Sequence, residues 1–260
     1  MPSGRPLLHH RLLGPHDAPS LVLGPSLGTS LQVWESHVAA LTEEFRVLSF
    51  DLPGHGGSPS GVLPTVAPGR TTVDDLARLV LDLIDHHRVD RFHYAGISLG
   101  GAIGAHLAVH HPHRVDSLAL VCSSAHFGTA GPWLQRAALV RQEGTAALLT
   151  AMPDRWFADP RAAAGPLGTA LLKDLAAADS SGYAACCDAL ATYDLRSALR
   201  RITVPTLVVG GTRDVATPLD HSRELAHAIP DAVLRTVAVG HLAVEDPETL
   251  CTALLTHLRH

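Results

Sequence analysis

Hydrophobic residues in this chain form short runs that alternate with longer segments of helical spacing. The short runs predict strands at residues 7–13, 21–24, 46–50, 93–95, 115–122, 205–211 and 233–239. The longer segments predict helices at residues 31–44, 72–87, 102–111, 219–228 and 247–258, the second with Thr72 as its N-cap. Strands that alternate with helices in this way predict an α/β fold, in which a mostly parallel sheet has helices on both faces.

The alternation stops between residues 123 and 201. Strand signals vanish there, and helical stretches follow one another at residues 133–142, 145–152, 167–178 and 183–191. We interpret this segment as a helical cap inserted into the α/β core. The chain is therefore divided into a first part of the core (1–122), the cap (123–201) and a second part of the core (202–260).

A serine lies between two glycines at a predicted strand-to-helix junction, in Gly96-Ile97-Ser98-Leu99-Gly100. This is the nucleophile-elbow pattern G-x-S-x-G, in which a tight turn leaves no room for bulky neighbours and holds the serine hydroxyl clear of the sheet. The helix N-terminus behind the serine favours developing negative charge. The alternative interpretation is a glycine-rich turn that only connects strand to helix.

A serine hydroxyl is a weak nucleophile near neutral pH, so it needs a base, and the base needs an acid that orients it. Asp214 and His241 each come directly after a predicted strand, at the sheet edge where α/β proteins place their sites. The chain order Ser98, Asp214, His241 is the order expected for this architecture. These three residues are the predicted catalytic triad.

Other acids compete with Asp214 for this role. Asp220 and Asp231 lie on or after a helix, which directs them away from the sheet edge. Asp51 follows a strand but precedes the serine, and it fits a turn-stabilising role. His55 lies in the same loop and could approach the site, although a structural role in the turn is the default interpretation for it too.

The tetrahedral intermediate of acyl transfer needs two N–H donors. The backbone of Leu99, directly after the nucleophile, should supply one, and Leu27, in the loop after the second strand, should supply the other. The alternative is that Gly28 and Thr29 in this loop simply cap the next helix.

Charge and composition exclude some classes of protein. A net charge of −5 leaves no basic footprint for nucleic acid, so no nucleic-acid partner is expected. No apolar run is long enough to span a bilayer, and the first residues lack the layout of a signal peptide, so no membrane partner is expected either. The four cysteines are Cys122, Cys186, Cys187 and Cys251. They form no C-x-x-C pair, and this favours a reducing cytoplasm as the location of the protein.

The chain has 18 histidines, several of them in adjacent pairs, and His106 and His110 lie one helical turn apart. Histidines at this spacing could hold a metal ion, but no acid or cysteine completes a ligand set in the sequence. We therefore predict no metal site and interpret these residues as solvated histidines near helix ends.

Six stretches match motifs of one enzyme family: Pro25-Ser26-Leu27-Gly28-Thr29 leading to Trp34, Asp51-Leu52-Pro53-Gly54-His55-Gly56 with Ser58, Gly96-Ile97-Ser98-Leu99-Gly100-Gly101, Arg155-Trp156-Phe157, Gly182-Tyr183-Ala184-Ala185-Cys186-Cys187 with Ala189-Leu190, and His241-Leu242 with Glu245 and Pro247. Through them the chain resembles the 3-oxoadipate enol-lactonases of the α/β-hydrolase superfamily over its whole length. The cap motifs and the first loop discriminate most, since the elbow is shared by many hydrolases. Pro25 stands where the family usually has Asn.

The resemblance implies a small-molecule lactone substrate. Water would open the ring of 3-oxoadipate enol-lactone to give 3-oxoadipate, in the β-ketoadipate pathway of aromatic degradation, through an acyl-enzyme on Ser98. It implies no metal and no organic cofactor. Another hydrolase activity on the same scaffold remains open, such as a carboxylesterase, a carbon–carbon-bond hydrolase or a perhydrolase, as does a ligand receptor without catalysis.

The substrate carries an acetate arm, which calls for a positive or donor-rich place in the cap. Arg136, Arg141 and Arg155 are candidates for it, with solvated surface arginines as the alternative. Trp133 and Trp156 are candidates for lining the pocket, with packing of the cap core as the alternative.

Overall fold

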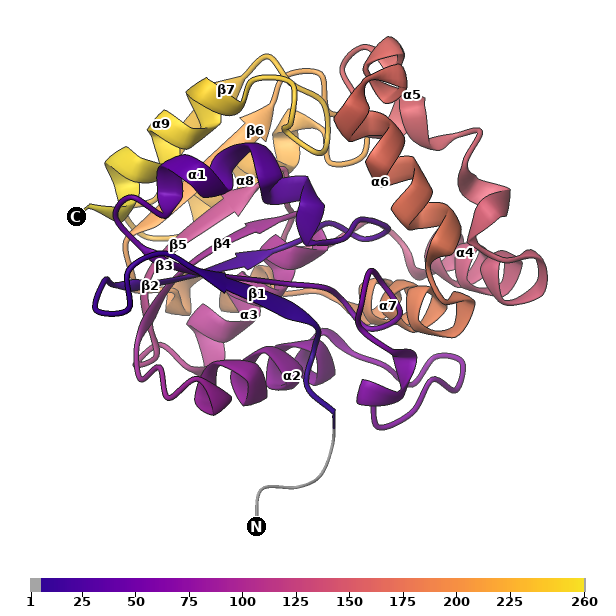
Figure 1. The fold of residues 1–260 in the computed structure, drawn as a ribbon, viewed down its shortest axis with the longest axis horizontal. Coiled ribbons are helices and arrows are strands. Elements are labelled where there is room, and N and C mark those ends of the chain that lie inside the picture. Colours follow the sequence, from indigo (N-terminus) through magenta and orange to yellow (C-terminus); the bar gives the residue numbers. More distant parts are fainter. Residues whose placement is uncertain (1–5, 260) are drawn as a thin grey trace.

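A seven-stranded sheet runs through the centre of the computed structural model, which describes residues 6–259 (Figure 1). Its order is β1-β3-β2-β4-β5-β6-β7; β1 is antiparallel to β3, and the other neighbours are parallel. The strands are β1 (His10–Leu13), β2 (Ser20–Gly24), β3 (Arg46–Phe50), β4 (Phe92–Ile97), β5 (Val115–Val121), β6 (Thr206–Gly211) and β7 (Val233–Val237). The predicted mostly parallel sheet is confirmed.

Helices cover both faces of the sheet. On one face, α1 (Glu35–Leu41) packs beside α9 (Pro247–Leu258), and on the other α2 (Val73–His86) packs beside α3 (Leu99–His110) (Figure 1). Helix α8 (Leu219–Ala228) packs against β6 and β7. The segment between β5 and β6 contains four further helices, which gather at one side of the molecule (Figure 1): α4 (Ala130–Glu143), α5 (Met152–Trp156), α6 (Pro166–Ala177) and α7 (Ser180–Thr192).

Short 3₁₀ helices complete the described elements, and they account for two of the differences from the predicted boundaries. They are η1 (Leu31–Trp34), η2 (Ser60–Val62), η3 (Thr145–Leu148), η4 (Pro160–Ala164) and η5 (Arg196–Arg201). The helix predicted at 31–44 is η1 followed by α1. Leu31 N donates to Asp51 and Gln32 N donates to Ser30, and these two bonds tighten the first turn. The helix predicted at 145–152 divides into η3 and a separate α5.

Two further boundaries differ at functionally relevant ends. Helix α3 begins at Leu99 rather than at residue 102, so Gly100 and Gly101 are helical although glycine disfavours helix. Strand β7 ends at Val237, two residues before the predicted end, which leaves a loop before His241. The predicted N-cap of α2 is confirmed: the Thr72 hydroxyl accepts from Asp75 N, and Asp75 accepts from Thr72 N, a capping box that stabilises a helix by about 1 kcal/mol.

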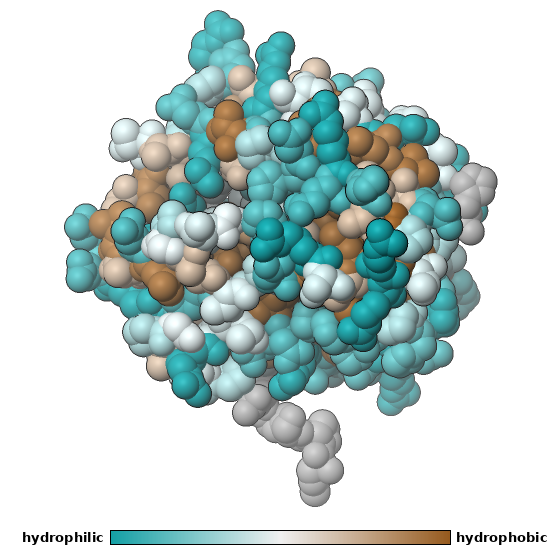
Figure 2. Space-filling view, turned by 180° about the vertical axis from the view of Figure 1, so that it is seen from behind, coloured by the Kyte–Doolittle hydropathy of each residue, from teal (hydrophilic) through white to brown (hydrophobic). Residues whose placement is uncertain are grey.

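On the face of the molecule shown in Figure 2, hydrophilic residues predominate, and hydrophobic residues appear between them in separate groups. Within residues 6–259, no helix combines the length and the apolar character that crossing a membrane requires.

His37 on α1 is a buried polar group whose two ring nitrogens have no hydrogen-bond partner in the described part of the chain. Burial, partly offset by the backbone of Trp34, lowers the pKa of His37 from 6.5 to about 4. The His37 ring of the unfolded chain binds a proton at a higher pH than the ring of the folded chain. The folded state is therefore favoured by this difference above pH 6.5, where the ring is neutral in both states. That contribution is lost as the pH falls from 6.5 towards 4.

We therefore expect His37→Leu to reduce the acid sensitivity of the fold. Between pH 7 and pH 4.5 the wild type should lose about 2–3 kcal/mol of unfolding free energy through this ring, and the variant should lose none of that share. Urea unfolding of both proteins at the two pH values measures the difference. Equal losses in both proteins would show that His37 does not cause the sensitivity.

Candidate active site

Ser98 occupies a strained turn between β4 and α3. Its backbone angles are φ 55° and ψ −115°, in the positive-φ region that residues with a side chain rarely adopt. Strand β4 ends at Ile97 and helix α3 begins at Leu99, so this single residue makes the whole turn. The predicted tight strand-to-helix turn is therefore present, with Ser98 at the N-terminus of α3.

The glycines on either side of Ser98 are needed because backbone atoms approach them closely. A Cβ atom on Gly96 would lie 2.3 Å from the carbonyl carbon of Gly100, and one on Gly100 would lie 2.4 Å from the carbonyl oxygen of Gly24. Gly100 N also donates a hydrogen bond of 3.1 Å to the carbonyl of Pro25. The turn at Ser98 is thus joined directly to the loop that follows β2.

Asp214 and His241, from the loops after β6 and β7, are hydrogen-bonded to each other. Nδ1 of His241 lies 2.9 Å from Oδ2 of Asp214. The other carboxylate oxygen accepts hydrogen bonds from the backbone of Ala216 (2.8 Å) and Thr217 (2.9 Å), which fixes the plane of the carboxylate. Because a carboxylate only accepts, the neutral His241 ring carries its proton on Nδ1, and Nε2 has a free lone pair.

Thr217 completes the surroundings of the carboxylate, a role that no motif or spacing in the sequence indicates. Its hydroxyl lies 2.6 Å from Oδ2 of Asp214 and 2.9 Å from the carbonyl oxygen of Cys122. Burial alone would raise the pKa of Asp214, but the electrostatic interaction with His241 and the hydrogen bonds from His241 and Thr217 outweigh it. The pKa of Asp214 therefore lies below its ordinary value, and the carboxylate stays ionised.

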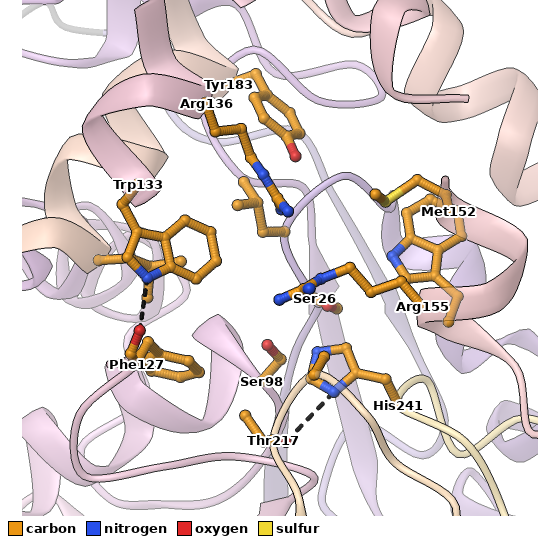
Figure 3. A pocket seen from close by; sticks show the side chains of 14 residues that line it. Ser26, Ser98, Phe127, Trp133, Arg136, Met152, Arg155, Tyr183, Thr217 and His241 are labelled. Carbon is orange, nitrogen blue, oxygen red and sulfur yellow. Dashed lines mark hydrogen bonds between the residues drawn. The ribbon is translucent and has the colours of Figure 1, made fainter. Parts of the chain in front are cut away.

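Ser98 and His241 border one pocket between the sheet edge and the cap (Figure 3). The Ser98 hydroxyl points into this space, and the His241 ring stands across from it (Figure 3). Both residues are nearly buried, at 5% and 6% exposure, so a bound substrate would be largely shielded from water. The pocket is lined by Ser26, Leu27, Ser98, Phe127, Trp133, Arg136, Met152, Arg155, Trp156, Tyr183, Leu190, Ala216, Thr217 and His241.

The two predicted oxyanion donors lie on the two loops that meet beside Ser98. Leu27 lines the pocket, and Leu99 is the first residue of α3. No hydrogen bond between described residues uses the N–H of Leu27 or of Leu99. Both groups are thus available to an oxyanion bound at Ser98.

His55 positions the loop that carries Leu27. Its Nε2 accepts a hydrogen bond of 3.1 Å from Gly28 N, and its Nδ1 lies 2.9 Å from the carbonyl of Pro53. Since that carbonyl can only accept, the proton sits on Nδ1, and burial, which lowers the pKa of His55, keeps the ring neutral. The ring also stacks on Tyr183 of the cap, with centroids 5.6 Å apart. His55 therefore acts on the site by holding the backbone of the Leu27 loop, and it does not line the pocket itself.

We expect His55→Phe to lower kcat by about tenfold to a hundredfold, because Gly28 N loses its acceptor and the neighbouring Leu27 peptide is no longer held in place. His55→Gln offers a replacement acceptor and should restore most of the activity. Steady-state kinetics of the two variants, with circular dichroism to check folding, makes the comparison. An unchanged kcat in His55→Phe would rule out this positioning role.

Asp51 has the predicted turn-stabilising role. Its carboxylate is fully buried and accepts from Leu31 N (2.6 Å), from Gly57 N (2.9 Å) and from Nδ1 of His9 (2.7 Å). It holds the loop around His55 and does not reach His241. Asp220, the competing acid on α8, pairs with Arg223 at 2.8 Å.

The structure separates the three arginines proposed for the acetate arm. Arg136 and Arg155 line the pocket. Arg141 instead lies 2.5 Å from the buried carboxylate of Asp188 and is absent from the pocket lining. Only the first two can meet a substrate beside Ser98.

The two tryptophans both line the pocket, and both also pack within the cap. Trp133 donates from Nε1 to the carbonyl of Phe127 at 2.7 Å, and Arg136 lies over its ring at 5.0 Å. The carbonyl of Trp156 accepts from Leu242 N at 3.2 Å, beside His241. Both tryptophans therefore line the pocket and pack within the cap, so the two interpretations of them do not exclude each other.

Glu245 joins the loop of His241 to the cap. One carboxylate oxygen accepts from Gly240 N at 3.1 Å, and the other accepts from Ala158 N at 2.5 Å. The motif match around His241 included this acid, although its bonding could not be derived from the sequence. It holds the loop in which His241 lies.

The histidine pair on α3 has an acidic neighbour that the sequence did not reveal. Nε2 of His106 lies 3.1 Å from Oδ1 of Asp74 on α2, and the His106 and His110 rings stack at 4.1 Å. His110 is exposed, as interpreted, but His106 is partly buried and paired.

Comparisons with known proteins agree with this architecture. A sequence model of the alpha/beta hydrolase fold matches residues 19–148, and one for TAP-like proteins matches residues 177–257. The chain is 33% identical to 3-oxoadipate enol-lactonase 2 of Acinetobacter baylyi over 93% of its length and 89% of that protein. It is 30% identical to a putative carbamate hydrolase RutD of Stutzerimonas stutzeri over 96% of both chains.

Among solved structures, the enol-lactonase from Burkholderia xenovorans LB400 superposes with a TM-score of 0.91 at 35% identity. The match covers 97% of this chain and 96% of that one. Both the sequence and the arrangement of the whole molecule therefore match hydrolases of this fold, 3-oxoadipate enol-lactonases among them. The chain belongs to the α/β-hydrolase family.

Proposed function

We propose that this protein is a serine hydrolase that opens the ring of 3-oxoadipate enol-lactone to give 3-oxoadipate. Ser98 attacks the lactone carbonyl while Nε2 of His241 takes its proton. Asp214 holds the ring and stabilises the imidazolium, and the N–H groups of Leu27 and Leu99 bind the oxyanion. When the ring C–O bond breaks, the ring oxygen leaves as an enolate on the acyl chain and takes the proton held by His241, and the enol then tautomerises to the ketone. Water activated by His241 hydrolyses the acyl-enzyme, which frees 3-oxoadipate and restores the Ser98 hydroxyl.

The observation that carries this substrate is the pair of arginines over Ser98. The guanidinium groups of Arg136 and Arg155 both point into the pocket (Figure 3), and neither forms a salt bridge with a carboxylate of the described residues. Burial and the positive charge of Arg136 lower the pKa of Arg155, as expected where two guanidinium groups share a partly buried pocket. A lactone with a carboxylate arm would neutralise this charge while its carbonyl meets Ser98.

The direct test is turnover of the enol-lactone by the purified chain, followed by loss of its absorbance, with Ser98→Ala as control. We expect rapid turnover that the control lacks. Neutral lactones, simple esters and carbamates are assayed in parallel. Preference for a carbamate or a neutral ester over the enol-lactone would contradict the proposed substrate and leave the hydrolase class intact.

Arg155→Met and Arg136→Met should each lower kcat/KM for the anionic enol-lactone by about tenfold to a hundredfold, the size expected for a charge-assisted hydrogen bond. Turnover of a neutral ester that reacts at the same serine should change little. This comparison separates recognition of the carboxylate from general damage to the pocket. Equal losses for both substrates would contradict an anion-binding role.

The proposed location is the cytoplasm. All four cysteines are free thiols and buried, which fits a reducing compartment. The enol-lactone would therefore be opened inside the cell, where the β-ketoadipate pathway operates.

A further inference from the structure

His126, His221 and Glu224 form a compact cluster outside the pocket. His126 follows β5, and His221 and Glu224 lie one turn apart on α8, so both project from the same side of the helix. One ligand atom of each residue lies within 4.8 Å of the others, and Nε2 of His126 is 3.6 Å from Oε2 of Glu224. All three side chains are partly buried.

His221 is oriented by Ser124. The Ser124 hydroxyl donates its single proton to the carbonyl of His126, so its oxygen can only accept from Nδ1 of His221, 2.6 Å away. Nε2 of the neutral ring then has a free lone pair. A hydrogen-bond acceptor on the far nitrogen fixes the tautomer and the ring orientation, as it does for histidines that bind metals.

His126 presents Nε2 towards Glu224, while its Nδ1 accepts a long hydrogen bond of 3.3 Å from Gly128 N. Coordination through Nε2 moves the ring proton to Nδ1 and breaks this bond. The loss is small because Gly128 is exposed and water can replace the acceptor. The Asp194 carboxylate, which lies nearby, is paired with Arg196 at 2.5 Å and does not belong to the cluster.

The cluster lies where the chain passes between the core and the cap. Leu195 N donates to the carbonyl of Ala125 at 2.8 Å, and His126 pairs with Asp194, so the outgoing and returning segments are bonded together. The next residue, Phe127, lines the pocket. An ion held here would join this crossing to the core helix α8.

We propose that His126, His221 and Glu224 bind one divalent transition-metal ion of the Zn²⁺ or Co²⁺ type, with water completing its coordination. Two imidazoles and one carboxylate are ligands that these ions accept. Mg²⁺ and Ca²⁺ prefer sites built of oxygen ligands and should not bind. The ion has a structural role at the base of the cap, and the hydrolysis proposed at Ser98 does not depend on it.

The test is a titration of the chelator-treated full chain with Co²⁺ and Zn²⁺. Visible absorption bands of bound Co²⁺ give the stoichiometry and the ligand type, and the thermal unfolding midpoint with and without Zn²⁺ gives the stabilisation. We expect one ion per chain and a raised midpoint. Glu224→Gln and His126→Gln should weaken binding by about tenfold or more.

The matched control is His227→Gln, which removes an exposed histidine from the same helix and should leave binding unchanged. Several weakly bound ions that Glu224→Gln does not affect would show binding by exposed histidines and overturn the proposal. Failure of the wild type to bind Co²⁺ or Zn²⁺ would overturn it as well. Circular dichroism of the metal-free variants confirms that each is folded before its affinity is compared.

Discussion

Replacing His241 with glutamine is expected to lower kcat for the enol-lactone by about 10⁴ to 10⁶-fold, since without a base the serine is not activated. A glutamine side chain can still hydrogen-bond to Asp214, which now holds Nδ1 of His241 at 2.9 Å. It cannot take a proton from Ser98. The fold should therefore survive, and binding of the substrate should change little.

Two controls make this result specific. Circular dichroism and the thermal midpoint of His241→Gln should match those of the wild type. His110→Gln removes an exposed histidine of α3 and should retain full activity. If His241→Gln stays within about tenfold of the wild-type kcat, some other group acts as the base and the assignment fails.

Asp214→Asn should lower kcat by about 10³ to 10⁴-fold, because it reverses the tautomer of His241. The oxygen of the new amide is held by the N–H groups of Ala216 and Thr217, at the place where Oδ1 of Asp214 accepts at 2.8 and 2.9 Å. Its NH₂ group then faces Nδ1 of His241. The ring must accept there, so its proton moves to Nε2, and the ring can no longer deprotonate Ser98.

The comparison variant for this prediction is Asp220→Asn. Asp220 is an exposed acid whose ion pair with Arg223 at 2.8 Å lies on α8, and its loss should leave turnover within about twofold of the wild type. Turnover is measured on the enol-lactone at a single pH for all variants. Asp214→Asn with nearly normal kcat would mean that the orientation of His241 does not depend on this carboxylate.

The sheet and the positions of the site residues could be predicted because both follow from local patterns. Apolar runs separated by helical periods predict parallel strands, and the carboxyl ends of parallel strands meet at one edge. Ser98, Asp214 and His241 each follow such a strand, so their placement at that edge needed no coordinates. The glycines around Ser98 indicated the tight turn, because backbone atoms approach them so closely that no residue with a Cβ atom fits there.

The remaining features depend on contacts between distant segments. The hydrogen bond between His55 and Gly28 joins two different loops. The proposed metal cluster likewise joins Glu224 on α8 to His126, which lies nearly one hundred residues earlier in the chain. Nothing in the spacing of these residues indicates the contact. The sequence could not distinguish the arginines for the same reason. Arg141 forms an ion pair with Asp188 on a neighbouring helix, whereas Arg155 forms no ion pair with any described acid.

Helix boundaries in the cap were the least predictable. Alanine-rich segments such as 145–152 have helical composition throughout, but short 3₁₀ turns and Pro153 divide them. Propensity alone does not place these breaks.

Reaction of the full chain with a serine-reactive phosphonate, with the modified residue located by mass spectrometry, tests whether Ser98 is the activated nucleophile. We expect one adduct, on Ser98, that forms more slowly when the enol-lactone is present and far more slowly in His241→Gln. An enzyme that turns over the enol-lactone while Ser98 remains unmodified would show that this hydroxyl is not the nucleophile.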